Sequence, residues 1–113
     1  MSLNIRWYLT TGLPAQCDRH RGPACQLDAS YQLHVTGGDG GDWFIDLPSH
    51  GPPAIRPGVE PARCTITMSS TTFRKLHKDP LASATSLHQK GKITVHGDLA
   101  LFARFPRLFT LPA

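Results

Sequence analysis

The sequence lacks a long apolar run, an even set of cysteines and a block of like charge. No segment approaches the roughly 18 consecutive apolar residues of a membrane-spanning helix. Three cysteines, Cys17, Cys25 and Cys64, cannot all pair with one another. The start of the chain lacks the charged and apolar regions of a secretory signal. We therefore expect one globular domain over residues 1–113, located in the cytoplasm, where thiols stay reduced.

The excess positive charge is scattered along the chain. The net charge is +4, and the basic residues lie in separate pairs rather than in one cluster. Nucleic-acid-binding segments concentrate such charge, so we expect no nucleic-acid partner. Arg104 and Arg107 lie among phenylalanines near the end of the chain. They are suited either to ordinary solvent exposure or to transient contact with an anionic membrane surface.

Motifs for catalysis or cofactor binding are missing too. The sequence has no nucleophile elbow, no phosphate-binding loop and no dinucleotide fingerprint. Cys17 and His20 have the spacing of a zinc-ligand pair, and Cys25 follows, but no second pair completes a site. A zinc site, a disulfide between Cys17 and Cys25, and unpaired structural thiols are the alternatives, of which we expect the last. We predict no catalytic residue, no metal and no cofactor.

Apolar residues in the sequence follow two different spacings, one typical of strands and one typical of helices. Apolar residues recur at every second position in some segments and at three- or four-residue spacings in others. Strands are expected over 27–36, 43–47, 64–68 and 92–96, with a short edge strand near 54–56. Helices are expected over 71–77, over 81–89 and from 99 onward, after a helical segment within 3–20 that Gly12 and Pro14 interrupt. A glycine-rich segment, 37–41, predicts a hairpin turn between the first two strands. This order predicts an α+β domain with helices packed on a mainly antiparallel sheet.

The most informative segment joins the last strand to the last helix. Ile93 and Val95 point to one face of the expected strand. Gly97 permits a sharp turn, and Asp98 is a favourable N-cap for the helix that follows. The apolar residues of that helix are expected to face the sheet: Leu99, Phe102, Phe105, Leu108 and Phe109.

These segments, in this order, resemble the SCP-2 (sterol carrier protein 2) domain family. They are Tyr31-x-Leu33-x-Val35, the glycine-rich hairpin, Trp43-x-Ile45-x-Leu47, Cys64-Thr65-Ile66-Thr67-Met68-Ser69, Phe73-x-x-Leu76 and Gly91-Lys92-Ile93-x-Val95-x-Gly97-Asp98. The resemblance extends from Leu27 to Phe109, whereas the N-terminal helical segment, 1–26, matches poorly. It implies an SCP2-like fold, in which a mainly antiparallel five-stranded sheet with helices on one face encloses an apolar tunnel.

The resemblance implies binding and transfer of lipids rather than catalysis. The ligand classes it suggests are a fatty acid, an acyl-CoA, a sterol, and an isoprenoid or quinone-like molecule. The alternative is a protein-interaction or accessory module that docks on an enzyme partner in a bacterial lipid or quinone biosynthetic pathway. We predict that the tunnel is lined by Trp43, Ile45, Met68, Phe73, Leu76, Ile93, Val95, Phe102 and Phe105.

Overall fold

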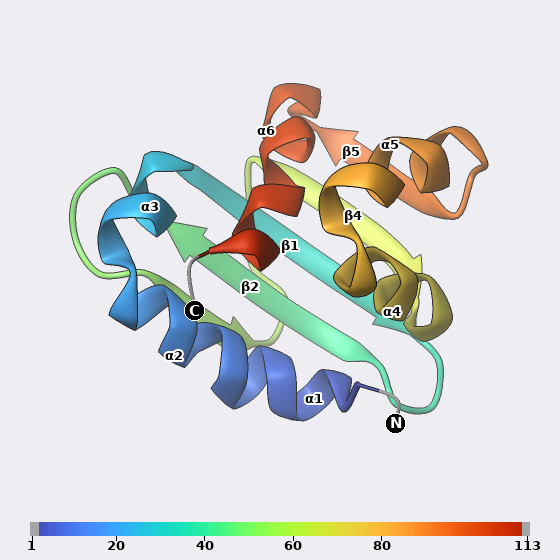
Figure 1. The fold of residues 1–113 in the computed structure, drawn as a ribbon, viewed down its shortest axis with the longest axis horizontal. Coiled ribbons are helices and arrows are strands. Elements are labelled where there is room, and N and C mark those ends of the chain that lie inside the picture. The colour runs from blue at the N-terminus through green and yellow to red at the C-terminus, as the bar shows by residue number, and fades with distance from the viewer. Residues whose placement is uncertain (1–2, 112–113) are drawn as a thin grey trace.

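Five strands form one sheet in the computed structural model, which describes residues 3–111 (Figure 1). The strands are β1 (Ala29–Thr36), β2 (Gly41–Leu47), β3 (Ala54–Pro57), β4 (Cys64–Ser69) and β5 (Ile93–Gly97). Their spatial order is β3-β2-β1-β4-β5. The β1–β2, β2–β3 and β4–β5 pairs are antiparallel, whereas β1 and β4 are parallel. The sheet is therefore mixed, although most of its pairs are antiparallel as predicted.

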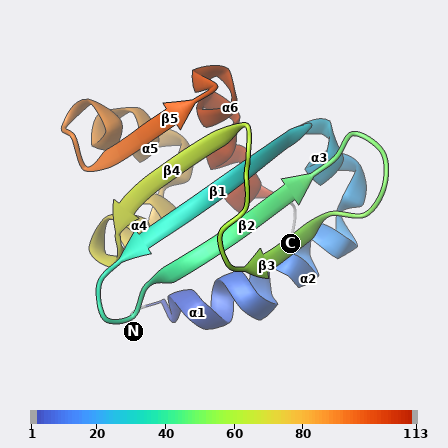
Figure 2. The same cartoon turned by 180° about the vertical axis from the view of Figure 1, so that it is seen from behind.

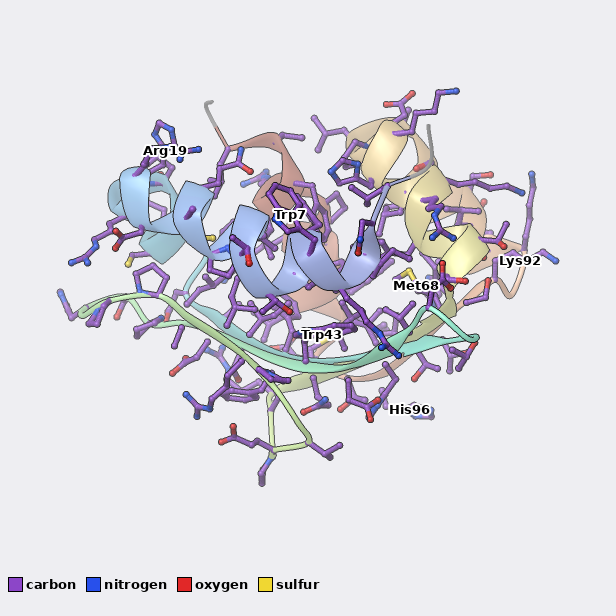
Figure 3. All side chains as sticks on the ribbon, turned by 90° about the horizontal axis from the view of Figure 1, so that it is seen from below. Trp7, Arg19, Trp43, Met68, Lys92 and His96 are labelled. Carbon is purple, nitrogen blue, oxygen red and sulfur yellow. The ribbon has the colours of Figure 1, made fainter. Side chains whose placement is uncertain are left out.

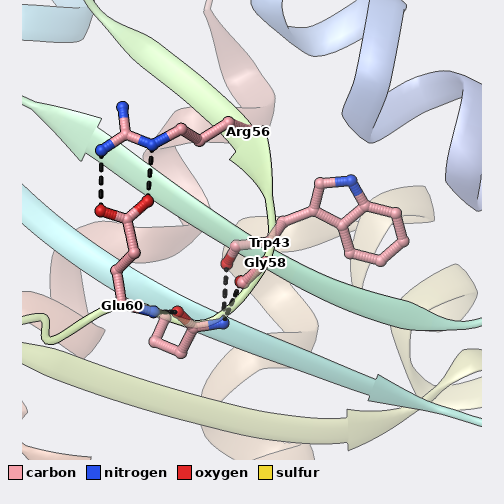
Figure 4. Close-up of polar contacts among 5 residues, drawn as sticks. Trp43, Arg56, Gly58 and Glu60 are labelled. Atoms are coloured by element: carbon pink, nitrogen blue, oxygen red, sulfur yellow. Dashed lines mark hydrogen bonds and ion pairs between the residues drawn. The ribbon is translucent and has the colours of Figure 1, made fainter.

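The parallel pair arises because the chain crosses behind the sheet between β3 and β4, on the face away from the helices (Figure 2). This crossing segment covers Gln32, which is only 2% exposed. The amide of Gln32 donates to the carbonyl of Gly58 (3.0 Å) and accepts from the N–H of Glu60 (2.8 Å). Arg56 pairs with the Glu60 carboxylate at the same place (Figure 4). Paired in this way, a polar side chain can be buried on the outer face at little cost.

The helices all cover the opposite face, as predicted (Figure 3). They are α1 (Ile5–Trp7), the π-helical turn η1 (Tyr8–Gly12), α2 (Leu13–Arg19), α3 (Arg21–Gln26), α4 (Ser70–Lys78), α5 (Pro80–Gln89), α6 (Leu99–Arg104) and the 3₁₀ helix η2 (Phe105–Thr110). Trp43 and Met68 point from the sheet toward these helices, whereas His96 points the other way. Within residues 3–111, no helix has the length and apolar character needed to cross a bilayer.

The interruption predicted at Gly12 and Pro14 is wrong, because helical backbone continues from Ile5 to Arg19. Pro14 has no N–H to donate to the carbonyl four residues earlier, which would leave that carbonyl unpaired in a regular α-helix. The wider η1 turn precedes it, and the N–H of Leu13 bonds to the carbonyl of Tyr8. The proline thus coincides with a π-helical turn instead of a break.

The junction after β5 has the predicted geometry. Gly97 has a φ of +98°, and a Cβ atom there would lie 2.5 Å from the carbonyl oxygen of Arg63. The carboxylate of Asp98 accepts a hydrogen bond from the N–H of Ala100 (2.9 Å), which caps α6. Only glycine fits the turn, and the aspartate satisfies one of the free N–H groups at the helix start.

The last helix differs from the prediction in two ways. Leu99 does not face the sheet, because it is 59% exposed, and Leu101 is buried in its place. The helix also changes to 3₁₀ geometry at Phe105, directly before Pro106. Phe105 and Leu108 still point inward and are fully buried.

Candidate functional site

Aromatic side chains fill the space between the sheet and the helices. The ring of Tyr31 on β1 lies 4.9 Å from that of Phe105, and Phe105 lies 5.0 Å from Phe109. Phe109 in turn contacts Phe73 on α4, with ring centroids 5.7 Å apart. The hydroxyl of Tyr31 donates a hydrogen bond to the carbonyl of Leu101 (2.6 Å). We call Tyr31, Phe73, Phe105 and Phe109 the aromatic cluster; it anchors α6 and η2 to the sheet.

The nine residues predicted to line a tunnel come together in this core. All but Val95 are buried, and Val95 is partly buried against the same cluster of side chains. They belong to a packed interior in this structure. Their contact with a ligand therefore stays a prediction.

An open apolar cleft lies beside this core, between α5 and α6. Its volume is about 320 Å³, within the range of small-molecule sites. Leu81 and Leu99 line it and are 65% and 59% exposed, which is unusual for large apolar side chains that meet at one place. Phe102 and His88 also line it, with ring centroids 5.0 Å apart. We call this site the α5–α6 cleft; its lining is Leu81, Ala84, Thr85, His88, Leu99, Phe102, Ala103 and Pro106.

Local sequence explains the shape of the α5–α6 cleft. Pro80 occupies the first turn of α5, where a missing N–H costs nothing, and places Leu81 beside the cleft. Ala84 and Ala103 present only methyl groups to it, so space remains between the two helices. Apart from Thr85 and His88, the lining side chains are apolar. The cleft is suited to a hydrocarbon chain.

Of the residues that line this cleft, only Phe102 is among those predicted from the sequence to contact a ligand. The apolar periodicity predicts that Leu99 faces the sheet, and it predicts only a helix over 81–89. The two leucines come from helices separated by β5, so periodicity within either helix cannot show that they meet. Ala84 and Ala103 cannot be recognised as lining residues from the sequence, because alanine occurs on every face of a helix.

The cysteines behave as structural thiols. Cys17, Cys25 and Cys64 are free; the first and last are buried, and Cys25 is half-buried. Burial raises the pKa of Cys17 and of Cys64 to about 11. Among residues 3–111, no group of three or more His, Cys, Asp or Glu side chains is placed to hold a metal ion.

Comparison with protein families gives a match over most of the chain. The model of the SCP-2 sterol transfer family matches residues 14–110. The chain belongs to the SCP-2 sterol transfer family. This confirms the resemblance seen in the sequence and makes the chain an SCP2 domain, a class that binds and transfers lipids.

Curated relatives carry a similar sequence within a much longer chain. Hydroxysteroid dehydrogenase-like protein 2 of Mus musculus is 33% identical over 88 residues, which cover 73% of this chain and 17% of the relative. The Homo sapiens protein of the same name is 33% identical over 82 residues, or 71% of this chain and 19% of the relative. The chain thus spans about a fifth of the length of the curated relatives it matches.

Solved structures share the fold at low sequence identity. The apo form of sterol carrier protein 2 from Yarrowia lipolytica is 20% identical, with a TM-score of 0.69 over 94% of this chain and 84% of that one. A UbiJ-SCP2 ubiquinone synthesis protein is 16% identical, with a TM-score of 0.70 over 95% and 97% of the two chains. Palmitated SCP2L2 from Aedes aegypti is 18% identical, with a TM-score of 0.67 over 96% and 95%. The SCP2-like arrangement of sheet and helices is thereby confirmed.

Proposed function

We propose that the protein binds a lipid without chemical conversion, and that the hydrocarbon chain of this lipid enters the α5–α6 cleft. The observation that carries the proposal is the meeting of exposed Leu81 and Leu99 over an apolar cleft. Membership of a lipid-transfer family supports it. The dehydrogenase-like name of the curated relatives belongs to proteins of which the matched segment is only 17%, so it gives no reason to propose catalysis here.

Among the candidate ligands, a linear chain fits the cleft best. A space of about 320 Å³ between two helices suits a fatty acid, the acyl part of an acyl-CoA, or an isoprenoid tail better than the fused rings of a sterol. The palmitated state of one structural neighbour supports the first of these. Each enclosed methylene contributes about 0.8 kcal/mol, so about six supply ~5 kcal/mol before the cost of ordering the chain.

We propose that a longer chain continues from the cleft into the core. Phe102 belongs to both places, since it lines the cleft and packs in the core beside the aromatic cluster. Displacement of α6 and η2 would turn the predicted lining residues into ligand contacts.

Transient contact with an anionic membrane surface would bring such lipids to the protein. The two arginines predicted for this contact, Arg104 and Arg107, have different surroundings in the structure. Arg104, the last residue of α6, donates a hydrogen bond to the carbonyl of Leu27 at the end of α3 (3.1 Å), whereas Arg107 is exposed. We therefore assign the membrane contact to Arg107 and propose a cytoplasmic location.

The packed core supports a second candidate, an accessory module that docks on an enzyme. Such a module needs no internal ligand space, and Leu81 and Leu99 would then contact the partner protein. One structural neighbour is a ubiquinone synthesis protein, which makes a lipid or quinone biosynthetic enzyme the partner to test.

Native mass spectrometry of the purified protein, followed by extraction and lipid identification, separates the two candidates. A stoichiometric lipid adduct supports the carrier. The accessory module is supported if the protein has the mass of the polypeptide alone, if this mass does not change after dodecanoate is added, and if the protein associates stably with an enzyme.

A matched pair of variants then tests the site. Ala103 lines the cleft, whereas Ala100 is also exposed on α6 but lies outside it. Ala103→Trp should fill the cleft and weaken dodecanoate binding about tenfold or more, and Ala100→Trp should bind as the parent protein does. Equal binding by all three proteins would contradict the proposed site.

A further inference from the structure

The structure holds a second cleft at the start of the chain, and from it we infer a binding site for an anionic oxygen group, a carboxylate or a phosphate, between Arg6 and Arg74. This cleft has a volume of about 470 Å³ and lies where α1 meets the β1–β2 turn and α4. It shares no residue with the α5–α6 cleft, so the inference does not depend on the proposed function. Its lining is Leu3, Asn4, Ile5, Arg6, Gly38, Asp39 and Arg74.

Main-chain carbonyls hold both guanidinium groups in place. The Nε of Arg6 donates to the carbonyl of Gly40 (3.1 Å), and the Nε of Arg74 donates to the carbonyl of Leu3 (3.1 Å). A guanidinium has five N–H donors, so each arginine keeps donors for a ligand after this contact. Because the two groups are fixed before a ligand arrives, less ordering is needed on binding.

The charges of the cleft favour an anion. Arg74 pairs with Asp39, whereas Arg6 pairs with no carboxylate among residues 3–111. Hydrogen bonding from Arg74 keeps the pKa of Asp39 below its usual value, so the aspartate is negative at neutral pH. Two arginines and one aspartate leave one positive charge in the cleft.

Asp39 acts as an internal competitor for the ligand. Its ion pair with Arg74 is open to solvent, and such pairs contribute little to stability. An incoming carboxylate or phosphate can therefore replace the aspartate at Arg74 while it contacts Arg6. Arginine suits both anions, because its planar guanidinium binds two oxygens side by side.

The anion has two possible sources, a free phosphate-bearing solute or the headgroup of a lipid. The lining of the cleft allows the second, because Leu3 is apolar and only partly buried beside the arginines. Leu3 can contact the chain of a lipid whose headgroup the two arginines bind.

The inference is tested by NMR, following the side-chain Nε–H signals of Arg6 and Arg74 while inorganic phosphate or dodecyl phosphate is added. We expect saturable shifts of both signals with either probe. Dodecyl phosphate binding at least about tenfold more tightly than inorganic phosphate would identify a lipid headgroup, and similar affinities would identify a free anion. Absence of saturable shifts with both probes would overturn the inference.

Three variants sharpen this test. Arg6→Gln should weaken phosphate binding about tenfold, whereas Asp39→Asn should tighten it about threefold, because the competitor is lost. If Asp39 had only a structural role, its replacement would not be expected to tighten phosphate binding. Ala103→Trp should leave phosphate binding unchanged even though it blocks the α5–α6 cleft. Any one of three results would overturn the inference. They are an unchanged phosphate affinity in Arg6→Gln, weaker phosphate binding in Asp39→Asn, and loss of phosphate binding in Ala103→Trp.

Discussion

Shortening Phe105 tests whether the aromatic cluster and the ligand compete for the same space. Phe105 is fully buried, packs on Tyr31 and Phe109, and lies one turn beyond Phe102 of the α5–α6 cleft. Phe105→Leu should lower the free energy of unfolding by about 1–2 kcal/mol, less than the 3–5 kcal/mol typical of replacing a buried phenylalanine by alanine. The space released accommodates one or two more ligand methylenes. At about 0.8 kcal/mol each, they should strengthen dodecanoate binding by about fourfold to fifteenfold.

Isothermal titration calorimetry with dodecanoate measures the affinity, and urea unfolding measures the stability. The matched control is Phe44→Leu, because Phe44 is also buried but lies on the outer face of the sheet beneath Arg56, with the guanidinium 5.0 Å from the ring centre. This control should lose similar stability and leave the affinity unchanged. Unchanged or weaker dodecanoate binding by a folded Phe105→Leu protein would refute the competition.

Three further predictions follow from local geometry. Gly97→Ala should lower the free energy of unfolding by ~2 kcal/mol or more, because φ is +98° and the added Cβ would lie 2.5 Å from a carbonyl oxygen. Gly91→Ala should lower it by only about 1 kcal/mol, because φ is +77° but no atom lies close to the added Cβ. Urea unfolding of both variants checks this. Burial lowers the pKa of His77 from 6.5, so the unfolded state binds its proton more readily, and stability should fall as pH decreases below 6.5. His77→Phe should remove that part of the pH dependence, and an unchanged difference in stability between pH 7 and pH 5 would contradict this explanation. Cys25 alone should react quickly with a thiol reagent in the native protein, because Cys17 and Cys64 are buried and their pKa values are raised to about 11. Rapid reaction of more than one thiol per protein molecule would contradict the burial of Cys17 and Cys64.

Features set by neighbouring residues could be predicted from the sequence. The hairpin between β1 and β2 follows from the glycines of 37–41, and the turn and cap after β5 follow from Gly97 and Asp98. Each depends on the conformational freedom or hydrogen-bonding capacity of one or two adjacent residues. Alternating apolar residues also predict the strand that contains Tyr31 and Leu33, both of which are fully buried.

Features that depend on distant segments could not be predicted in this way. Burial of Gln32 requires the backbone of Gly58 and Glu60, which a pattern within β1 cannot reveal. The parallel pairing of β1 with β4 depends on how the chain crosses behind the sheet. The α5–α6 cleft likewise depends on the approach of two helices, and the exposure of Leu99 reflects how α6 is rotated relative to the sheet. Periodicity identifies an apolar face but does not show which helix will cover it.

Binding of a lipid chain between α5 and α6 can be tested by locating the bound chain itself. Isotope-filtered NMR of the protein with carbon-13-labelled dodecanoate would record which protein protons lie next to the ligand. We expect contacts from the methylenes to Leu81, Leu99 and Phe102, three of the residues that line the cleft. A bound chain without contacts to these three residues, or no binding of dodecanoate at all, would contradict this expectation.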